Sequence, residues 1–443
     1  MFGQHFIIIN SLPVARALME KRSSIYSDRP VIPTAELMGI GFSTVHRQYG
    51  DEWRLHRKLF HQALRAESAS TYRSTYARKT HGLLSNLLES PATFTQHLKS
   101  HVASTVMAMT YGYETKPNQD PIVDNVEELI RLLEKELAPE RAVALTMFPF
   151  LARVPSWFPG GGFKESIARG QSFSERVMNE PFDFVLRTVA NGTAPPSMVS
   201  DLLGTLDEKE DYQTQEQAIR EAAATVFIDQ GLLQSASVLQ SFVLAMLLHP
   251  HIQARAHAEI DAIVGNDRLP SFEDRPSMPY IEAIIREVLR WRPVVPLGIP
   301  HATAIDDYYE GYFIPKGAIV IMNAWAMSRD PSRFDDPESF RPERHFTFNG
   351  KLIDSPLTTD PVFGLGRRNC PGKFASDELL WITIVSVLAV FKVEHALDAN
   401  GRPVEVGDAF EGGIAIHPRP FACNFTPRYP SVPALVRSTC TKK

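Results

Sequence analysis

The sequence contains few cysteines: three among 443 residues, namely Cys370, Cys423 and Cys440. None belongs to a C-x-x-C pair, so neither a disulfide framework nor a typical zinc or dithiol site is expected. The C-terminal tail, which begins at Cys440, lacks the aliphatic positions of a prenylation signal. This cysteine usage favours a reducing compartment, in which a single cysteine can still serve as a metal ligand.

Long apolar runs and an excess of one charge are also absent. The longest apolar run, residues 379–391, is shorter than the ~20 residues that a membrane-spanning helix needs, and we expect it to be a buried helix. The N-terminal residues do not show the basic and then apolar pattern of a signal peptide. With 46 Lys and Arg against 51 Asp and Glu, the formal charge is −5, so we expect no nucleic-acid partner.

Helical patterns dominate what is present. Helical spacing or helix-forming composition covers residues 127–137, 201–208, 218–264 and 280–292, whereas residues 6–9 and 318–322 are typical of short strands. No internal repeat and no flexible linker divides the chain. The sequence therefore predicts one large, mainly helical domain with small β-sheets, covering residues 1–443.

The most informative segment is F-G-L-G-R-R-N-C-P-G, residues 363–372, directly before a predicted helix. A cysteine at the start of a helix lies near unpaired backbone N–H groups and the positive end of the helix dipole, which favour a thiolate. Gly364, Gly366 and Gly372 permit sharp turns or close approach to a flat cofactor, and Arg368 can bind an acidic group. The pattern indicates that Cys370 ligates the metal of a macrocycle.

This loop resembles the cysteine loop of the cytochrome P-450 superfamily, the haem-thiolate monooxygenases. Residues 287–290 match the E-x-x-R motif of that family, and residues 340–344 match its P-E-R segment. The resemblance implies that Glu287, Arg290 and Arg344 form a buried triad with a structural role. The E-x-x-R spacing recurs at residues 128–131 and 338–341, where we expect exposed surface pairs.

The resemblance also implies the cytochrome P-450 fold, with haem between a long I helix and the cysteine loop with its L helix. Residues 53–57 match the W-x-x-x-R motif of the C helix, which places Trp53 and Arg57 beside a haem propionate. His301 is expected to be a further propionate partner. The resemblance implies that Cys370 is the axial iron ligand and that the loop residues Phe363, Gly366, Arg368 and Gly372 contact haem.

The sequence departs from the family in the I helix, predicted between residues 222 and 250. Where relatives carry A/G-G-x-D/E-T-T, this chain has Gln230, Gly231, Leu232, Leu233, Gln234 and Ser235. The acid and the threonine that deliver protons to dioxygen are missing, so Gly231, Gln234 and Ser235 are the candidate distal relay. Three explanations remain open: a relay through substrate or water, an enzyme that does not protonate dioxygen, and a wrongly joined gene model.

By resemblance, the protein is a fungal haem-thiolate monooxygenase that oxidises a small lipophilic metabolite, in secondary metabolism or xenobiotic oxidation. The alternatives are a non-oxygenating haem isomerase or dehydratase and a catalytically impaired haem-binding paralogue. The expected cofactor is haem b. The expected pocket walls are residues 40–44, 227–232, 294–299 and 412–414, which are mostly apolar.

The resemblance implies electron supply from NADPH through NADPH-cytochrome P-450 reductase, with cytochrome b5 as a further partner. An acidic reductase would suit the basic face predicted from Arg54, His56, Arg57, Lys58, Arg367 and Lys373. The family location is the cytosolic face of the endoplasmic reticulum. The family's anchor, hinge and first helix have no counterpart in this sequence, so a cytosolic or peripheral protein is the alternative, with membrane contact near residues 147–158.

Overall fold

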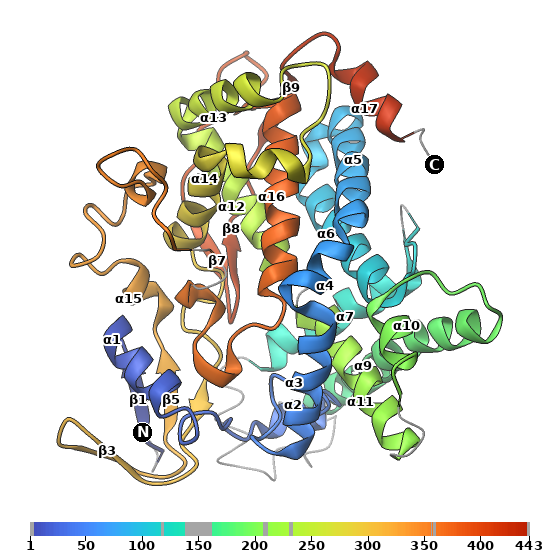
Figure 1. Cartoon of the computed structure of the whole chain (residues 1–443), viewed down its shortest axis with the longest axis vertical. Coiled ribbons are helices and arrows are strands. Elements are labelled where there is room, and N and C mark those ends of the chain that lie inside the picture. The colour runs from blue at the N-terminus through green and yellow to red at the C-terminus, as the bar shows by residue number, and fades with distance from the viewer. Residues whose placement is uncertain are drawn as a thin grey trace.

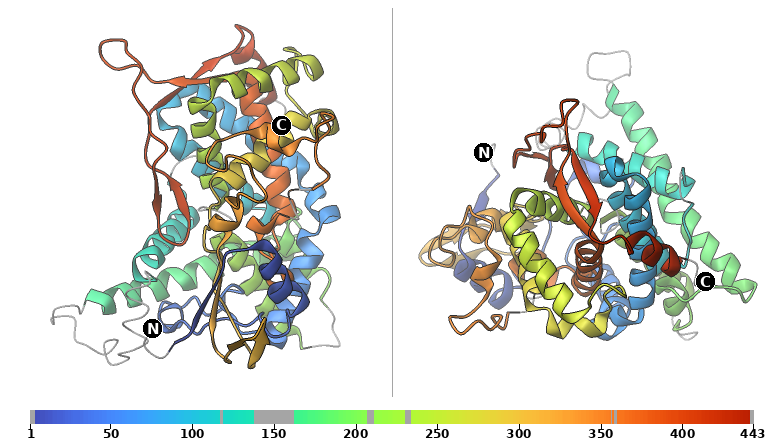
Figure 2. Two further views of the ribbon diagram at one scale, coloured as in Figure 1. Left: turned by 90° about the vertical axis from the view of Figure 1, so that its left-hand side faces the viewer. Right: turned by 90° about the horizontal axis from the view of Figure 1, so that it is seen from above.

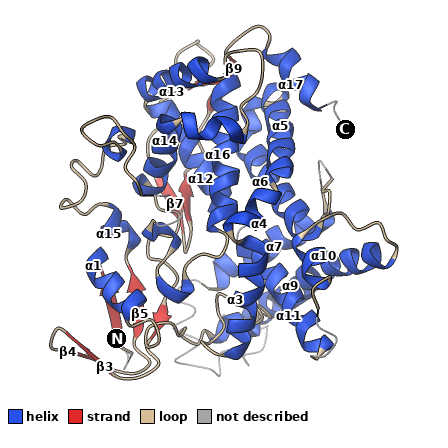
Figure 3. Cartoon of the chain, in the orientation of Figure 1, coloured by secondary structure: helices blue, strands red, loops and turns tan. Residues whose placement is uncertain are grey.

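The structure is a computed structural model that describes residues 4–116, 119–137, 162–206, 211–229, 234–355, 357 and 360–440. Helices make up most of the molecule, and small strand pairs lie at its side and at one end (Figures 1 and 3). The expected site of membrane contact, residues 147–158, lies outside the described residues. The predicted fold class, mainly α with small β-sheets, is confirmed.

A single apolar helix, α16 (Lys373–Val390), runs through the middle of the helical part (Figure 1). It contains most of the long apolar run, and thirteen of its eighteen residues are buried. A helix that is apolar on every side needs neighbours on every side. α16 has them in α4 (Ala66–Thr71), α5 (Arg73–Glu89), α12 (Ser235–Leu248), α13 (Pro250–Ile263) and α14 (Pro279–Trp291).

The remaining helices surround this centre, and Figure 2 shows their arrangement from two further directions. α14 and α16 begin within one residue of the starts that the sequence predicts. The other α-helices are α1 (Leu12–Ala15), α2 (Pro33–Leu37), α3 (Asp51–Leu64), α6 (Phe94–Tyr111), α7 (Pro121–Glu136), α9 (Gly162–Ala190), α10 (Met198–Leu203), α11 (Tyr212–Asp229), α15 (Ala324–Ser328) and α17 (Val432–Cys440).

The strands form one three-stranded sheet and three pairs. In the larger sheet, β5 (Ile319–Met322) lies between β1 (Phe6–Ile9), which is parallel to it, and β2 (His301–Ala302), which is antiparallel. This sheet fixes the backbone of His301 opposite Val320. The pairs are β3 (Asp307–Tyr309) with β4 (Tyr312–Ile314), β6 (Phe391–His395) with β9 (Cys423–Pro427), and β7 (Phe410–Gly412) with β8 (Ile416–Pro418).

The predicted I helix between residues 222 and 250 is described in two parts, α11 and α12, and residues 230–233 between them lie outside the described residues. α12 is followed at Pro250 by α13, and their axes differ by 104°. Proline has no backbone N–H and is accepted at the start of a helix, so Pro250 separates the two. Among the described helices, none is by itself long and apolar enough to cross a membrane, although this bent pair satisfies length and composition together.

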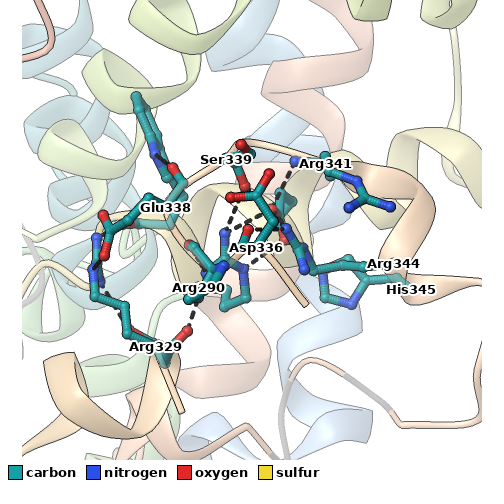
Figure 4. Close-up of polar contacts among 12 residues, drawn as sticks. Arg290, Arg329, Asp336, Glu338, Ser339, Arg341, Arg344 and His345 are labelled. Atoms are coloured by element: carbon teal, nitrogen blue, oxygen red, sulfur yellow. Dashed lines mark hydrogen bonds and ion pairs between the residues drawn. The ribbon is translucent and has the colours of Figure 1, made fainter. Parts of the chain in front are cut away.

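The expected triad forms a buried ion cluster between α14 and the short 3₁₀ turn at Pro342–His345 (Figure 4). Glu287 has no exposed side-chain surface. Its carboxylate accepts two hydrogen bonds from Arg290, at 2.7 and 2.8 Å, and one from Arg344 at 3.0 Å. His345, which the sequence did not single out, contacts the same carboxylate at 3.0 Å.

These partners also determine the charge of the buried carboxylate. Burial raises the pKa of Glu287, but hydrogen bonds from Arg290 and His345 outweigh it and hold the pKa below its usual value. The two arginines extend the cluster to the carbonyl of Ser328 at the end of α15 and to carbonyls of the loop before the 3₁₀ turn, those of Asp335, Asp336, Pro337 and Ser339. The cluster therefore joins α14 to the irregular segment before the 3₁₀ turn.

The surface pairs expected at the other E-x-x-R positions differ from each other. Glu128 contacts Arg131 on the exposed surface of α7, as expected. Glu338 instead pairs with Arg329 at 3.0 Å, because residues 338–341 are not helical and the i to i+3 spacing no longer brings their side chains together.

We predict that Glu287→Gln destabilises the protein by about 3–5 kcal/mol, because it leaves buried arginines without a compensating charge. Denaturant unfolding followed by far-ultraviolet circular dichroism measures this loss. Glu128→Gln is the matched control, since its partners Arg131 and Arg169 have side chains that are 69% and 50% exposed. The control should lose less than about 1 kcal/mol. Equal losses in the two variants would contradict the structural role of the cluster.

Candidate functional site

The cysteine loop is a compact turn that ends at the start of α16. The Cys370 N–H donates to the carbonyl of Phe363 at 2.7 Å, which closes the loop. Gly364 has φ +76°, a backbone conformation that L side chains rarely adopt. Gly366 has φ +64°, and a Cβ there would lie 1.9 Å from the carbonyl oxygen of Met19. The glycines therefore let the loop fold tightly and pack on the N-terminal segment.

Beside this loop is a cavity that is lined by segments from many parts of the chain. Cys370 and Phe363 are on the loop side, and Gln234 and Ser235 at the start of α12 also contribute. Most of the wall is apolar. The apolar side chains that line it are Met19, Val45, Trp53, Phe60, Val226, Val238, Leu289, Val294, Val295, Ile299, Met322, Ala324, Val362, Leu365, Pro371 and Leu380.

Two arginines of the cavity wall are held in place by neighbouring chain segments. Arg57, on α3, donates to the carbonyl of Asn369 at 2.7 Å. The Arg368 guanidinium lies 4.6 Å from the centre of the Trp53 ring. Burial lowers the pKa of Arg368 to about 10, although the charge of Asp28 opposes this shift. Arg368 also donates to the carbonyls of Ser27 at 2.9 Å, Thr44 at 3.2 Å and Arg47 at 2.8 Å.

Two further basic side chains, His301 and Arg29, complete the polar part of the wall. Nδ1 of His301 is 2.7 Å from the carbonyl of Tyr26 and donates to it. Burial, together with the charges of Arg29 and Arg368, lowers the pKa of His301 well below its ordinary value. Arg29 donates to the carbonyls of Val45, Ile299 and Pro300 at 2.7–2.9 Å.

The charge balance of the cavity is one-sided. Among the described residues, Arg29, Arg57, His301 and Arg368 line it, and no Asp or Glu does. Cations held away from water without a facing anion are costly, because each loses much of its hydration. The wall therefore fits a ligand that carries negative charge at one end and is otherwise apolar.

The side chains available as metal ligands further restrict which ligand the cavity can hold. Within the described part of the chain, no group of three or more His, Cys, Asp or Glu side chains could hold a metal ion. A metal bound at the Cys370 sulfur must therefore bring its other ligands with it. A flat, apolar, iron-containing macrocycle with two carboxylates satisfies the sulfur, the basic groups and the apolar wall together, so the residues present fit haem.

The structure brings most of the expected haem contacts together, with two exceptions. Trp53, Arg57, His301, Phe363 and Arg368 all line the cavity with Cys370. Gly366 and Gly372 are not among its lining residues. Gly366 packs against the backbone of Met19, and Gly372 is the buried N-cap residue of α16, so direct haem contact by these two glycines stays a prediction.

The structure places some of the predicted distal residues and predicted pocket walls at the cavity, but not all of them. Gln234 and Ser235 line the cavity, whereas Gly231 lies outside the described residues. The expected wall at 294–299 contributes four residues, and Thr44 represents the wall at 40–44. Residues 412–414 do not line the cavity, and on α11 Thr225 and Val226 line it in place of Phe227 and Ile228.

His56 was placed on the basic surface by sequence reasoning, and the structure contradicts this. It is 1% exposed on α3, on the same face as the buried Trp53, Phe60 and Ala63. Its neighbours Arg54 and Lys58 are exposed, as expected. The spacing 53, 56, 60, 63 is that of a buried helix face, and this signal could have identified His56 from the sequence.

Comparisons with known proteins give matches over nearly the whole chain. The model of the family "Cytochrome P-450" matches residues 1–425. The chain is 38% identical over 442 residues to cytochrome P-450 monooxygenase COX2 of Coprinopsis cinerea, covering 99% of this chain and 84% of that protein. It is 37% identical over 444 residues to cytochrome P-450 monooxygenase claR of Ampulloclitocybe clavipes, covering 99% of this chain and 81% of that protein.

A solved structure supports the fold independently. The zebrafish cytochrome P-450 determined with abiraterone superimposes with a TM-score of 0.73 and covers 95% of this chain and 93% of that chain, at 22% sequence identity. The predicted fold is thereby confirmed, and the fungal relatives confirm the predicted enzyme class. With a cysteine beside a basic cavity, a family match over nearly the whole sequence and relatives of this kind, the chain belongs to the cytochrome P-450 family of haem-dependent monooxygenases.

Proposed function

We propose that this protein binds haem b with Cys370 as the axial ligand and oxidises a small lipophilic metabolite with one atom of dioxygen. The observation that carries the proposal is the cavity in which a thiol, four basic side chains and an apolar wall meet without a carboxylate from the described residues. Residues 1–443 would form one catalytic domain. The names of the fungal relatives favour this function over an isomerase or a haem-binding protein without activity.

Each group of cavity residues would have a separate role. Arg57, Arg368 and His301 would hold the propionates, with His301 taking up a proton when it faces an anion. Bound haem supplies oxygen-activating chemistry, which a thiolate ligand assists by donating electron density to iron. The apolar residues of α11, α12 and residues 294–299 would exclude water and orient the substrate.

Electrons would arrive from NADPH through NADPH-cytochrome P-450 reductase, with cytochrome b5 as a second possible donor. Arg54, Lys58 and Arg367 are exposed and Lys373 is half-buried, so these four can face an acidic partner. His56 is removed from the predicted face because it is buried. By family resemblance the protein would work at the cytosolic face of the endoplasmic reticulum, or in the cytosol with peripheral membrane contact.

The proposed activity is tested by a substrate screen followed by isotope labelling. Compounds that displace water from the iron shift the absorbance of the resting protein and so identify occupants of the cavity. The protein is then supplied with NADPH, reductase and ¹⁸O₂. The expected product carries one ¹⁸O atom and forms only with reductase. Conversion of the bound compound without reductase would contradict the proposal and support the isomerase.

We predict that Arg57→Leu weakens haem binding about tenfold or more, because a charge-assisted hydrogen bond to a propionate contributes about 1.5–3 kcal/mol. The rate of haem transfer to apomyoglobin measures this effect. Arg54→Leu is the matched control on the same helix, since the Arg54 side chain is 54% exposed and pairs with Asp51. Its transfer rate should equal that of the unmodified protein. Equal rates for all three proteins would exclude Arg57 as a propionate ligand.

A further inference from the structure

A row of hydrogen-bonding side chains leads from the cavity wall toward the surface. Thr44 lines the cavity, and its hydroxyl lies 2.8 Å from Nδ1 of the buried His56. On the other side of the ring, Nε2 of His56 lies 3.2 Å from the carboxylate of Glu221 on α11. The row therefore connects the loop before α3, α3 itself and α11.

Thr225 holds the inner end of this row in position. It lies one turn after Glu221 on α11 and also lines the cavity. Its hydroxyl accepts the Thr44 N–H at 3.2 Å and donates to the Glu221 carbonyl at 2.8 Å. The two threonine hydroxyls are 3.5 Å apart. These contacts fix the Thr44 hydroxyl between the His56 ring and the cavity.

The outer end of the row reaches solvent. The Glu221 side chain is 15% exposed, whereas that of His56 is 2% exposed. Glu221 also accepts from Gln217 at 2.9 Å and contacts Arg47. Burial raises the pKa of Glu221, but hydrogen bonds from His56 and Gln217 and the charge of Arg47 hold it below its ordinary value. A carboxylate therefore faces Nε2 and can compensate a positive charge on the ring.

The cavity has few other groups that could deliver a proton. At the start of α12, Gln234 and Ser235 line the wall, and neither side chain is an acid. In the described residues the other titratable groups of the wall are Cys370 and the basic cluster assigned above to iron and propionates. Dioxygen chemistry needs protons at the cavity, so within the described part of the chain we look for a source outside the start of α12.

We infer that His56 and Glu221 form a proton-holding pair that supplies the cavity through the hydroxyl of Thr44. This inference rests on the proposed monooxygenase function and adds its proton source. In this pair the acid is Glu221 on α11, and the hydroxyl is that of Thr44 in the loop before α3. The family motif has its acid and its threonine at adjacent positions, which correspond to residues 233 and 234 of this chain.

The delivery step moves one proton and no electrons. The Nδ1–H bond of the doubly protonated His56 ring breaks as an O–H bond forms at Thr44 Oγ1, and the original Thr44 hydroxyl proton passes to an acceptor in the cavity. The ring is left neutral, with its Nε2–H donated to the Glu221 carboxylate. Solvent returns one proton to the pair before the next turnover.

Two substitutions separate storage of the proton from its delivery. Glu221→Gln removes the charge that holds the ring protonated, and Thr44→Val removes the hydroxyl between the ring and the cavity at nearly constant shape. His101→Gln is the matched control: His101 is also buried and contacts a threonine hydroxyl, that of Thr383 at 3.0 Å, but it does not line the cavity.

The first measurement is independent of activity. In the reduced, carbon monoxide-bound holoprotein labelled with ¹⁵N-histidine, the signals lost in His56→Gln are those of His56. We expect them to report a doubly protonated ring in the unmodified protein, in Thr44→Val and in His101→Gln, and a neutral ring in Glu221→Gln. A neutral ring in the unmodified protein, or an unchanged charge in Glu221→Gln, would overturn the inference.

The second measurement is hydrogen peroxide released per NADPH oxidised, with reductase present. Without its proton source the enzyme should release more peroxide, and we expect an increase of about threefold or more in both Glu221→Gln and Thr44→Val, and none in His101→Gln. Unchanged peroxide in Thr44→Val would overturn the delivery route. A failure of the proposed function can be told apart from a failure of this inference. In the first case the unmodified protein would oxidise no NADPH, although the charge of its His56 ring could still be measured.

Discussion

The position of one sulfur atom relative to a cluster of positive charge is the constraint on which the rest of the site depends. The thiol of Cys370 is fixed by a hydrogen-bonded turn just before α16, and four basic side chains line the same cavity. The cluster of buried cations is unfavourable in isolation, since cations without a facing anion lose hydration. A haem satisfies both the sulfur and the cluster, so the cofactor is expected to stabilise the fold as well as to supply the chemistry.

The contacts that support the site and the residues that line its cavity belong largely to different parts of the structure. α16 is enclosed by five helices, and the Glu287 cluster ties α14 to the irregular segment that precedes the cysteine loop. The cavity itself is lined by side chains of α3, α11, α12, α14 and α16 and by loops, so residues from distant parts of the sequence meet there. The His56–Glu221 pair follows the same principle, because it joins two helices that are far apart in the chain.

Local patterns allowed much of this structure to be predicted. The strand at Phe6–Ile9, the starts of α14 and α16 and the cysteine turn follow from periodicity, proline and glycine positions and one dense motif. Contacts between distant segments could not be predicted in the same way. Nothing near Gly366 indicates that the backbone of Met19 will pack against it. Glu221 belongs to no motif, and its contact with His56 arises only because α3 packs on α11.

The most direct test of the account is the absorbance spectrum of the reduced protein with and without carbon monoxide, compared between the unmodified chain and Cys370→Ala. Thiolate-ligated haem gives a carbon monoxide band that differs from that of haem with a nitrogen or water ligand. We expect the unmodified protein to show the thiolate band and Cys370→Ala to lose it. A purified protein without haem absorbance, or the same band in Cys370→Ala, would contradict the central claim that this sulfur binds the iron.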